Sequence, residues 1–210
     1  MNSSEIENGI RHIYNNDKYL AKVIDISEPC NIYPKKNYFN AVLRSIIGQQ
    51  LSPNVSQKIN IRFLEYFNNR PTPELILNAD ENDLRGLGLS WAKIKYVKDF
   101  SFKLINKEIS LKGISNKNDG DIIEMLTVVK GIGVWTVHML LVFTLGRVNV
   151  LPVGDFALRK AAKNIYGLKK IPDEKKIVRL SKQYNWEPYN SVASWYLWKS
   201  LELKNNEPQP

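Results

Sequence analysis

The stretch Leu126–Leu158, LTVVKGIGVWTVHMLLVFTLGRVNVLPVGDFAL, constrains the fold of this chain more than any other segment. Its pattern predicts a helix end, a tight glycine turn, a buried helix, an extended connection and then Asp155 at the start of another helix. Gly131 and Gly133 permit positive backbone φ angles, so consecutive amides of the turn could converge on one anion at a helix N-terminus. An ordinary corner between two helices can use the same residues, and this segment alone leaves both interpretations open.

The rest of the chain also follows helical spacing. Apolar residues from Phe39 to Ile47 recur three and four positions apart, Gly48 ends that predicted helix, and Pro53 suits the first turn of the next. No segment shows the sustained alternation that is typical of a β-strand, and the connections are short. We therefore predict an all-helical chain with around ten helices. Its 210 residues fit one domain or two closely packed lobes.

Charge and cysteine content narrow the classes of partner and site. The chain has 30 Lys and Arg against 21 Asp and Glu, a formal net charge of +9 that favours a polyanionic partner. Cys30 is the single cysteine, which excludes an internal disulfide framework, a Cys-ligated zinc site and a four-cysteine iron–sulfur cluster. The N-terminus lacks the apolar core of a signal peptide, and no apolar run approaches the roughly 20 residues that span a bilayer.

Four segments of the chain resemble blocks of a known enzyme family. LTVVKGIGVWTV resembles the helix–hairpin–helix of the base-excision DNA glycosylase (HhH-GPD) superfamily, and NVLPVGDFALRKA resembles the segment that carries the catalytic aspartate of that superfamily. SIIGQQLS and WEPYNSVASWYLW match two further blocks, specifically of the 3-methyladenine-DNA glycosylase II branch. The four blocks occur in the family order and fall within residues 38–199.

The resemblance implies a fold and its subdivision. It implies the all-α helix–hairpin–helix glycosylase fold, in which two closely packed helical lobes hold the active-site cleft between them. Residues 1–210 would form a single glycosylase unit, with the helix–hairpin–helix at about 119–146 and the catalytic-aspartate segment at about 149–166. Because the first block begins near Tyr38, we expect no separate N-terminal β-domain.

Asp155 is the first candidate for catalysis. It follows Pro152 and Gly154 and precedes a predicted helix, so by sequence alone it is a helix N-cap, as Asp119 and Asp173 are. Amides and the dipole at a helix N-terminus favour the charged form of a carboxylate. A carboxylate in a dry site stabilises the oxocarbenium-like sugar that forms as a base departs, and it can orient or deprotonate the attacking water. The resemblance assigns this role to Asp155.

Trp135 predicts the type of reaction. The resemblance implies that members of the superfamily that also cut the strand through a Schiff base carry lysine at this position, and tryptophan cannot form an imine. We therefore expect monofunctional hydrolysis, without a lyase step, that leaves an abasic site. The single cysteine separately argues against the iron–sulfur branches of the superfamily.

An aromatic pocket is expected to hold the flipped base. An electron-deficient alkylated base is attracted to aromatic rings by a cation–π-like interaction of about 1–2 kcal/mol when desolvated. The resemblance places aromatic walls at Trp135 and Trp198, and we add Tyr38 and Met139 as lining residues. Some relatives have aromatic or amide side chains at the positions of His138 and Met139. Each of the pocket candidates could instead belong to the core.

Two turns and their lysines are expected to contact DNA. The GQQLS turn matches the family segment that fills the gap left by the flipped base, with Gln50 as the wedge and Leu51 as the alternative. The alternative is that the glutamines of this turn only hydrogen-bond the backbone of the turn. Likewise, lysines on a helix often face solvent without binding a partner. The other predicted contacts come from the hairpin and from a second, looser hairpin: Lys130, Gly131, Gly133, Val134 and Lys93. Whether the hairpin carbonyls bind a monovalent cation stays open, and we expect no other metal and no cofactor.

These features together predict a hydrolase of base excision repair. It would flip alkylated purines, 3-methyladenine foremost and then 7-methylguanine and related lesions, out of the duplex and cleave the N-glycosidic bond. The expected partner is double-stranded DNA with damaged bases, and we expect a monomer without membrane contact, in the cytoplasm with the nucleoid of a prokaryote or in the nucleus of a eukaryote. Two alternatives are a glycosylase for deaminated or oxidised bases and a non-catalytic DNA-binding module. A pure phosphate binder needs neither Asp155 in this context nor Trp135.

Overall fold

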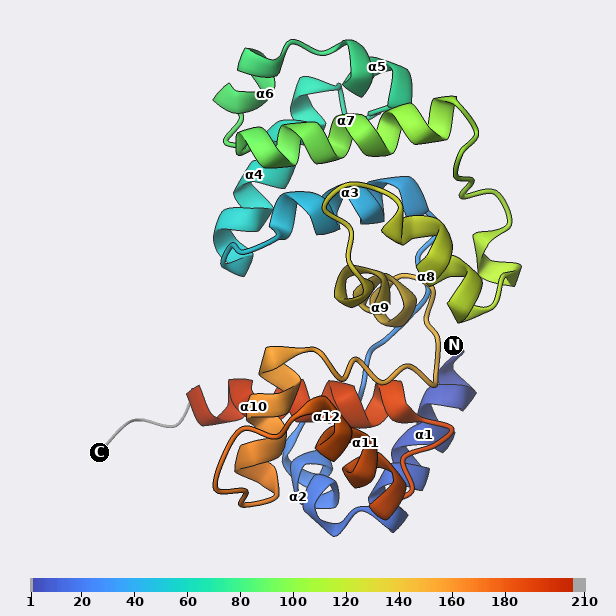
Figure 1. The fold of residues 1–210 in the computed structure, drawn as a ribbon. Helices are drawn as coiled ribbons and strands as arrows, with labels where there is room; N and C mark the ends of the chain where they lie inside the picture. Colours follow the sequence, from blue (N-terminus) through green and yellow to red (C-terminus); the bar gives the residue numbers. More distant parts are fainter. Residues whose placement is uncertain (1, 206–210) are drawn as a thin grey trace. The chain divides into compact units, whose positions relative to one another are not determined.

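The computed structural model describes residues 2–205 of the chain, and the side chains of residues 2–203. Within this range twelve α-helices and one 3-10 helix occur and no β-strand, which confirms the all-helical prediction (Figure 1). In chain order the elements are α1 (Ser3–Asn16), α2 (Lys18–Ile26), α3 (Tyr38–Gly48), α4 (Pro53–Tyr66), α5 (Pro73–Asn78), α6 (Glu81–Gly86), α7 (Trp91–Ile105), η1 (Ile114–Asn116), α8 (Asp119–Thr127), α9 (Val134–Phe143), α10 (Phe156–Ile165), α11 (Glu174–Gln183) and α12 (Asn190–Asn205).

The chain divides into two compact units. The terminal unit consists of Met1–Lys35 and Leu141–Pro210, and the central unit consists of Lys36–Leu140. Helices α1, α2, α10, α11 and α12 therefore belong to the terminal unit, and α3 to α8 belong to the central unit. The boundary lies within α9. None of the described helices has the length and apolar character required to cross a membrane.

Helix α7 organises the central unit. Its side chains Ile94, Val97 and Phe100 are completely buried, and the helix packs against α3, α5 and α6. The ring of Phe100 stacks on Phe39 of α3, with 5.5 Å between ring centroids and 19° between ring planes. The predicted apolar face of residues 39–47 is confirmed, since the side chains at 42, 43, 46 and 47 are buried. The core of this unit is therefore built from helix faces that the sequence periodicity already marks.

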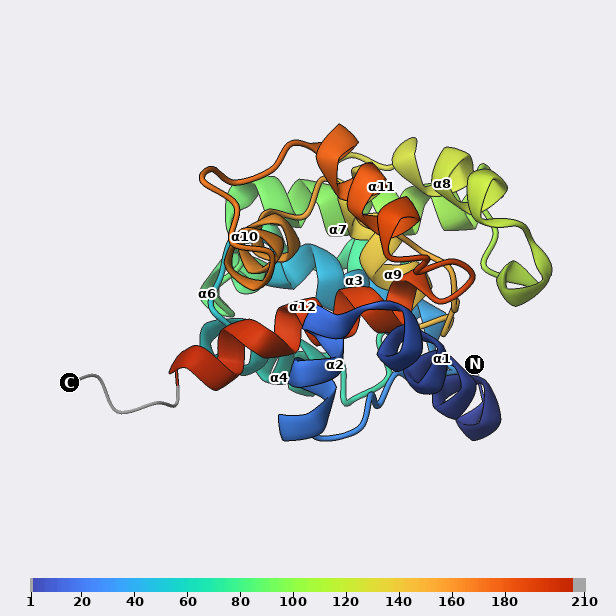
Figure 2. The same ribbon diagram turned by 90° about the horizontal axis from the view of Figure 1, so that it is seen from below.

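Asp17 organises the terminal unit, in which α12 packs on α1, α2 and α10 (Figures 1 and 2). Asp17 is completely buried at the junction of α1 and α2, where its Oδ1 accepts the backbone N–H groups of Tyr19 and Leu20 at 3.0 and 3.1 Å. Its Oδ2 accepts the hydroxyl of Tyr166 at 2.6 Å and the indole N–H of Trp186 at 2.9 Å. Because Tyr166 follows α10 and Trp186 precedes α12, one buried carboxylate joins the junction of α1 and α2 to the segments beside α10 and α12.

Candidate active site

Asp155 lies at the N-cap of α10, as predicted. Its Oδ1 accepts the backbone N–H of Leu158 at 2.5 Å, and the residue is 7% exposed. Asp173 also caps its helix, α11, but it is exposed. The predicted cap at Asp119 is wrong, because Asn118 supplies the side-chain oxygen at the start of α8. Of the three aspartates that the sequence presents as caps, only Asp155 is buried.

Trp198 of α12 contacts the Asp155 carboxylate directly. Its indole Nε1 donates to Asp155 Oδ1 at 2.8 Å, and its ring lies 5.3 Å from the ring of Phe143. Trp198, Phe143 and Trp195 also line a surface depression of about 240 Å³. The terminal unit therefore brings the predicted catalytic carboxylate and one of the predicted pocket residues together. Hydrogen bonds to a carboxylate are stronger than neutral ones and fix its orientation.

The extended connection before Asp155 is held by the start of α12. The Ser191 hydroxyl accepts the backbone N–H of Val150 at 3.0 Å, and the Ser191 backbone N–H donates to the Val148 carbonyl at 3.0 Å. The amide of Asn190 donates to Asn149 Oδ1 at 2.6 Å. Sequence reasoning did not identify this polar contact, which fixes the segment that leads to the catalytic candidate.

The glycine hairpin uses its two glycines differently. Gly131 adopts a φ of +79°, and a Cβ built there would lie 2.2 Å from the ring of Tyr96. Only glycine fits both the backbone angle and the space. Gly133 does not adopt the positive φ that glycine permits, and a Cβ there would meet no atom within 4 Å. The turn before α9 is nevertheless as tight as predicted, with the Ile132 side chain buried beneath it.

Lys130 of the hairpin has an acidic neighbour that the sequence did not reveal. Its backbone N–H donates to Asp99 Oδ2 at 2.8 Å, and its Nζ lies 3.9 Å from Asp99 Oδ1. The Lys130 side chain remains 73% exposed, so its contact with DNA stays a prediction. The charge that it offers to a phosphate is reduced by the neighbouring carboxylate.

The predicted wedge turn is attached to the hairpin and to α7. Gln49 Nε2 donates to the Gly131 carbonyl at 2.7 Å, and Lys93 Nζ donates to the Ile47 carbonyl at 2.7 Å. Burial lowers the pKa of Lys93. Lys93 thus has a structural role that the sequence did not predict, and its phosphate contact stays a prediction. Gln50 is exposed with a φ of +56°, whereas Leu51 is half-buried, which favours Gln50 as the residue that can reach a partner.

The remaining pocket candidates lie in the central unit. Trp135 and Val134, in the first turn of α9, are 44% and 49% exposed. Tyr38 and Met139 are half-buried. Trp135 is therefore not a core residue of this unit, so the alternative that it belongs to the core rather than to a pocket is excluded. Roles in base binding for these residues stay predictions.

Comparison with known proteins gives consistent matches. The family model described as HhH-GPD superfamily base excision DNA repair protein matches residues 43–187. DNA-3-methyladenine glycosylase 1 of Schizosaccharomyces pombe is 34% identical over 191 residues, which cover 90% of this chain and 83% of that protein. YfjP of Bacillus subtilis is 36% identical over 171 residues, 78% of this chain, and the chain spans 59% of that longer protein. The solved structure of S. pombe 3-methyladenine DNA glycosylase Mag1 in complex with abasic DNA superposes with a TM-score of 0.82 at 32% identity, over 93% of this chain and 97% of that one. These matches confirm the fold predicted from the four sequence blocks.

Proposed function

The chain belongs to the HhH-GPD superfamily of base excision DNA repair proteins, and we propose that it is a monofunctional DNA glycosylase that hydrolyses the N-glycosidic bond of alkylated purines. Its partner is DNA, and the proposed substrate is double-stranded DNA that contains 3-methyladenine, 7-methylguanine or a related lesion. The observation that carries the proposal is the buried Asp155, held at the N-cap of α10 by Leu158 and contacted by Trp198.

The chemistry assigned to Asp155 follows from its charge and its hydrogen bonds. Departure of an alkylated, cationic purine leaves electron deficiency on the deoxyribose, and an anion held beside the sugar lowers the energy of that state. The N–H groups of Leu158 and Trp198 both bond Oδ1. The proposal assigns to this carboxylate the task of facing the sugar or accepting a proton from the attacking water. The alkylated base leaves as a neutral molecule, so the purine itself needs no strong general acid.

The proposed reaction ends at the abasic site. Trp135 stands where a lyase would need an amine, and an indole cannot form the Schiff base through which a strand is cut. The solved Mag1 structure contains abasic DNA, which is the chemical product of such base release. We propose that the protein acts as a monomer, because one chain supplies all the residues assigned to the reaction.

The test is release of free base by the wild-type protein from a panel of duplexes. Duplexes with 3-methyladenine or 7-methylguanine are expected to release the base, and the treated strand should break only after heating in alkali. Borohydride should trap no covalent protein–DNA complex. Release from deaminated or oxidised bases alone would replace the alkylpurine assignment, and no release from any lesion would refute the enzyme assignment.

A further inference from the structure

The positive charge of the chain is concentrated in one segment that the mechanism does not use. Residues 159–182 contain nine Lys and Arg and two Asp and Glu, a formal charge of +7 out of +9 for the whole chain. All the other residues together therefore carry only +2. The segment comprises most of α10, the connection that follows it and nearly all of α11. Its basic residues are Arg159, Lys160, Lys163, Lys169, Lys170, Lys175, Lys176, Arg179 and Lys182.

Most of these cations are exposed and have no acidic partner. Six of the nine are exposed: Lys160, Lys169, Lys170, Lys175, Arg179 and Lys182. Within the described part of the chain, none of these six forms an ion pair with Asp or Glu. An exposed cluster of like charges repels itself and costs stability unless a polyanion neutralises it.

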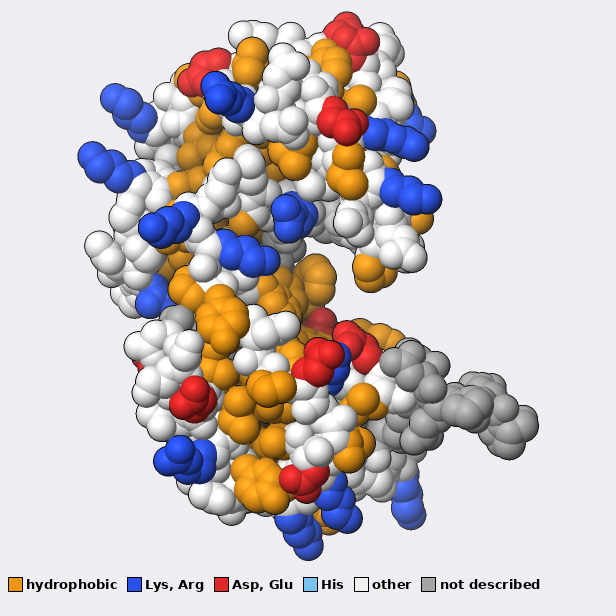
Figure 3. All heavy atoms as spheres, turned by 180° about the vertical axis from the view of Figure 1, so that it is seen from behind, with side chains coloured by type: hydrophobic (Ala, Val, Ile, Leu, Met, Phe, Trp, Pro, Cys, Tyr) orange, Lys and Arg blue, Asp and Glu red, His pale blue; other side chains and the backbone are white. Residues whose placement is uncertain are grey.

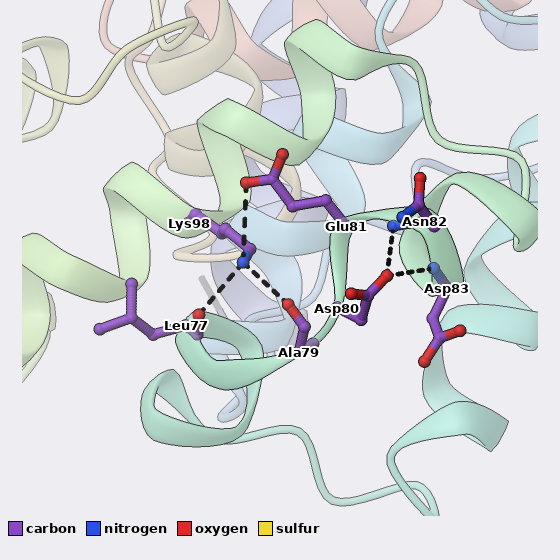
Figure 4. A network of polar contacts seen from close by, with 7 residues as sticks. All are labelled: Leu77, Ala79, Asp80, Glu81, Asn82, Asp83 and Lys98. Atoms are coloured by element: carbon purple, nitrogen blue, oxygen red, sulfur yellow. Dashed lines mark hydrogen bonds and ion pairs between the residues drawn. The ribbon is translucent and has the colours of Figure 1, made fainter.

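Several lysines of the central unit, by contrast, form hydrogen bonds or ion pairs with other residues of that unit. Lys98 Nζ donates to the carbonyls of Leu77 and Ala79 at 3.2 and 2.8 Å and lies 3.7 Å from Glu81 Oε1 (Figure 4). Lys103 pairs with Glu108 at 2.9 Å. Lys130 has Asp99 beside it and Lys93 has the Ile47 carbonyl. On the face drawn in Figure 3, the Lys and Arg side chains are scattered rather than gathered.

The basic segment is folded back onto the residues around Asp155. Arg159, one turn into α10, donates from Nε to the Pro172 carbonyl at 2.6 Å and so attaches the start of α11 to the start of α10. A Cβ built on Gly154 would lie 3.5 Å from Glu174 Oε1, which places the first turn of α11 against the residue before Asp155. The unpaired cations therefore belong to the same unit that carries the catalytic candidate, and α11 packs next to that candidate.

We propose that α10, α11 and their connection form a second DNA contact, a cationic surface that binds the phosphate backbone beside the lesion independently of the glycine hairpin. This inference rests on the proposed function for its ligand. Binding to phosphates releases condensed counterions, so this surface supplies affinity that is independent of sequence and falls with salt. The hairpin holds one phosphate through backbone amides, whereas the basic segment supplies the long-range attraction that brings the protein onto undamaged as well as damaged duplex.

The experiment compares two variants that lose the same net charge. In the test variant, four exposed residues of the segment are changed: Lys169→Gln, Lys170→Gln, Lys175→Gln and Arg179→Gln. In the control variant, four exposed residues elsewhere in the terminal unit are changed: Arg11→Gln, Lys18→Gln, Lys22→Gln and Lys35→Gln. Affinity for an undamaged duplex and for a duplex with an abasic-site analogue is measured by anisotropy between low and moderate salt.

The test variant is expected to bind both duplexes more weakly at low salt, and its log–log salt slope should fall by about 0.9 for each phosphate that the protein no longer neutralises. The control variant is expected to keep the wild-type affinity and salt slope for both duplexes. A salt slope equal to that of the wild type, or an equal change in the control variant, would overturn the proposal. Failure of the wild type to release any base would refute the proposed function alone, because the salt slopes are read without turnover.

Discussion

Asp17→Asn is expected to destabilise the terminal unit, although the substitution replaces only one oxygen of the side chain by an NH₂ group. The carboxylate accepts four hydrogen bonds, from two backbone N–H groups, the Tyr166 hydroxyl and the Trp186 indole. The amide oxygen of asparagine can still accept the two backbone bonds that cap α2. Its NH₂ group would then face the indole N–H, so two donors would meet where the carboxylate accepted one.

The magnitude follows from which bonds survive. Trp186 is completely buried, so its N–H would lose a bond to a charged acceptor without gaining one to water, which costs about 1.5–3 kcal/mol. The Tyr166 hydroxyl can rotate and accept from the new amide, which retains a weaker bond. We expect a total loss of about 2–4 kcal/mol, a large part of the roughly 5–15 kcal/mol by which a domain is stable.

Urea unfolding followed by circular dichroism measures this loss as a lower midpoint at unchanged slope. The matched control is Asp173→Asn, an exposed N-cap at which Asn and Asp cap about equally well and the change should stay within about 0.5 kcal/mol. If Asp17→Asn destabilises the protein no more than Asp173→Asn does, the idea that this carboxylate holds α10 and α12 in place is wrong.

Three further variants test the hairpin, the site and the Tyr166 phenol. Gly131→Ala should cost about 2–5 kcal/mol in urea unfolding, because alanine meets both an unfavourable φ and the Tyr96 ring. Trp198→Phe keeps an aromatic ring but removes the donor to Asp155, and single-turnover base release should slow about 10- to 100-fold with little loss of DNA affinity. Burial, followed by the Asp17 charge and hydrogen bond, raises the pKa of Tyr166, so the fold retains a proton that the unfolded chain releases above about pH 10. Stability is lost as pH rises beyond that value, and Tyr166→Phe should lessen the slope by about 1.4 kcal/mol per pH unit.

Each of these expectations has a result that contradicts it. Gly133→Ala is the control for the hairpin, and equal effects of the two alanines would show that the φ and the contact at Gly131 do not matter. If Trp198→Phe releases the base at the wild-type rate, the hydrogen bond from Trp198 to Asp155 does not contribute to the reaction. An alkaline unfolding slope that Tyr166→Phe leaves unchanged would show that the phenol ionises alike in the folded and unfolded chains.

The sequence predicts the features of this structure that neighbouring residues determine. The Asp155 cap needs only a carboxylate before a helical pattern, and the buried face of α3 needs only apolar residues three and four apart. The turn at Gly131 is also predicted from neighbouring residues, because glycine readily adopts the positive φ found there. Sequence alone does not tell Gly131 from Gly133, because glycine permits a positive φ without requiring one and only Gly131 adopts it.

The contacts that the sequence could not reveal join residues far apart in the chain. Trp186 lies 169 positions from Asp17, and Gly131 lies 82 positions from Gln49, so only the packed fold brings these donors and acceptors together. A buried aspartate before a helix looks in sequence like any other N-cap. The basic segment at 159–182 is visible in the sequence as a run of lysines. Only the fold shows that six of its cations are exposed, that they have no acidic partner among the described residues, and that the segment packs next to Asp155.

Single-turnover base release by Asp155→Asn tests the central claim most directly. Asparagine can cap α10 and accept from Leu158 and Trp198, so the variant should fold and should bind an abasic-site duplex as the wild type does. It lacks the negative charge, and an NH₂ group replaces one oxygen of the carboxylate. We predict that release of 3-methyladenine falls by about 10²-fold or more, the loss of about 3 kcal/mol or more of transition-state stabilisation. Release at the wild-type rate by a folded, DNA-binding Asp155→Asn protein would contradict the account.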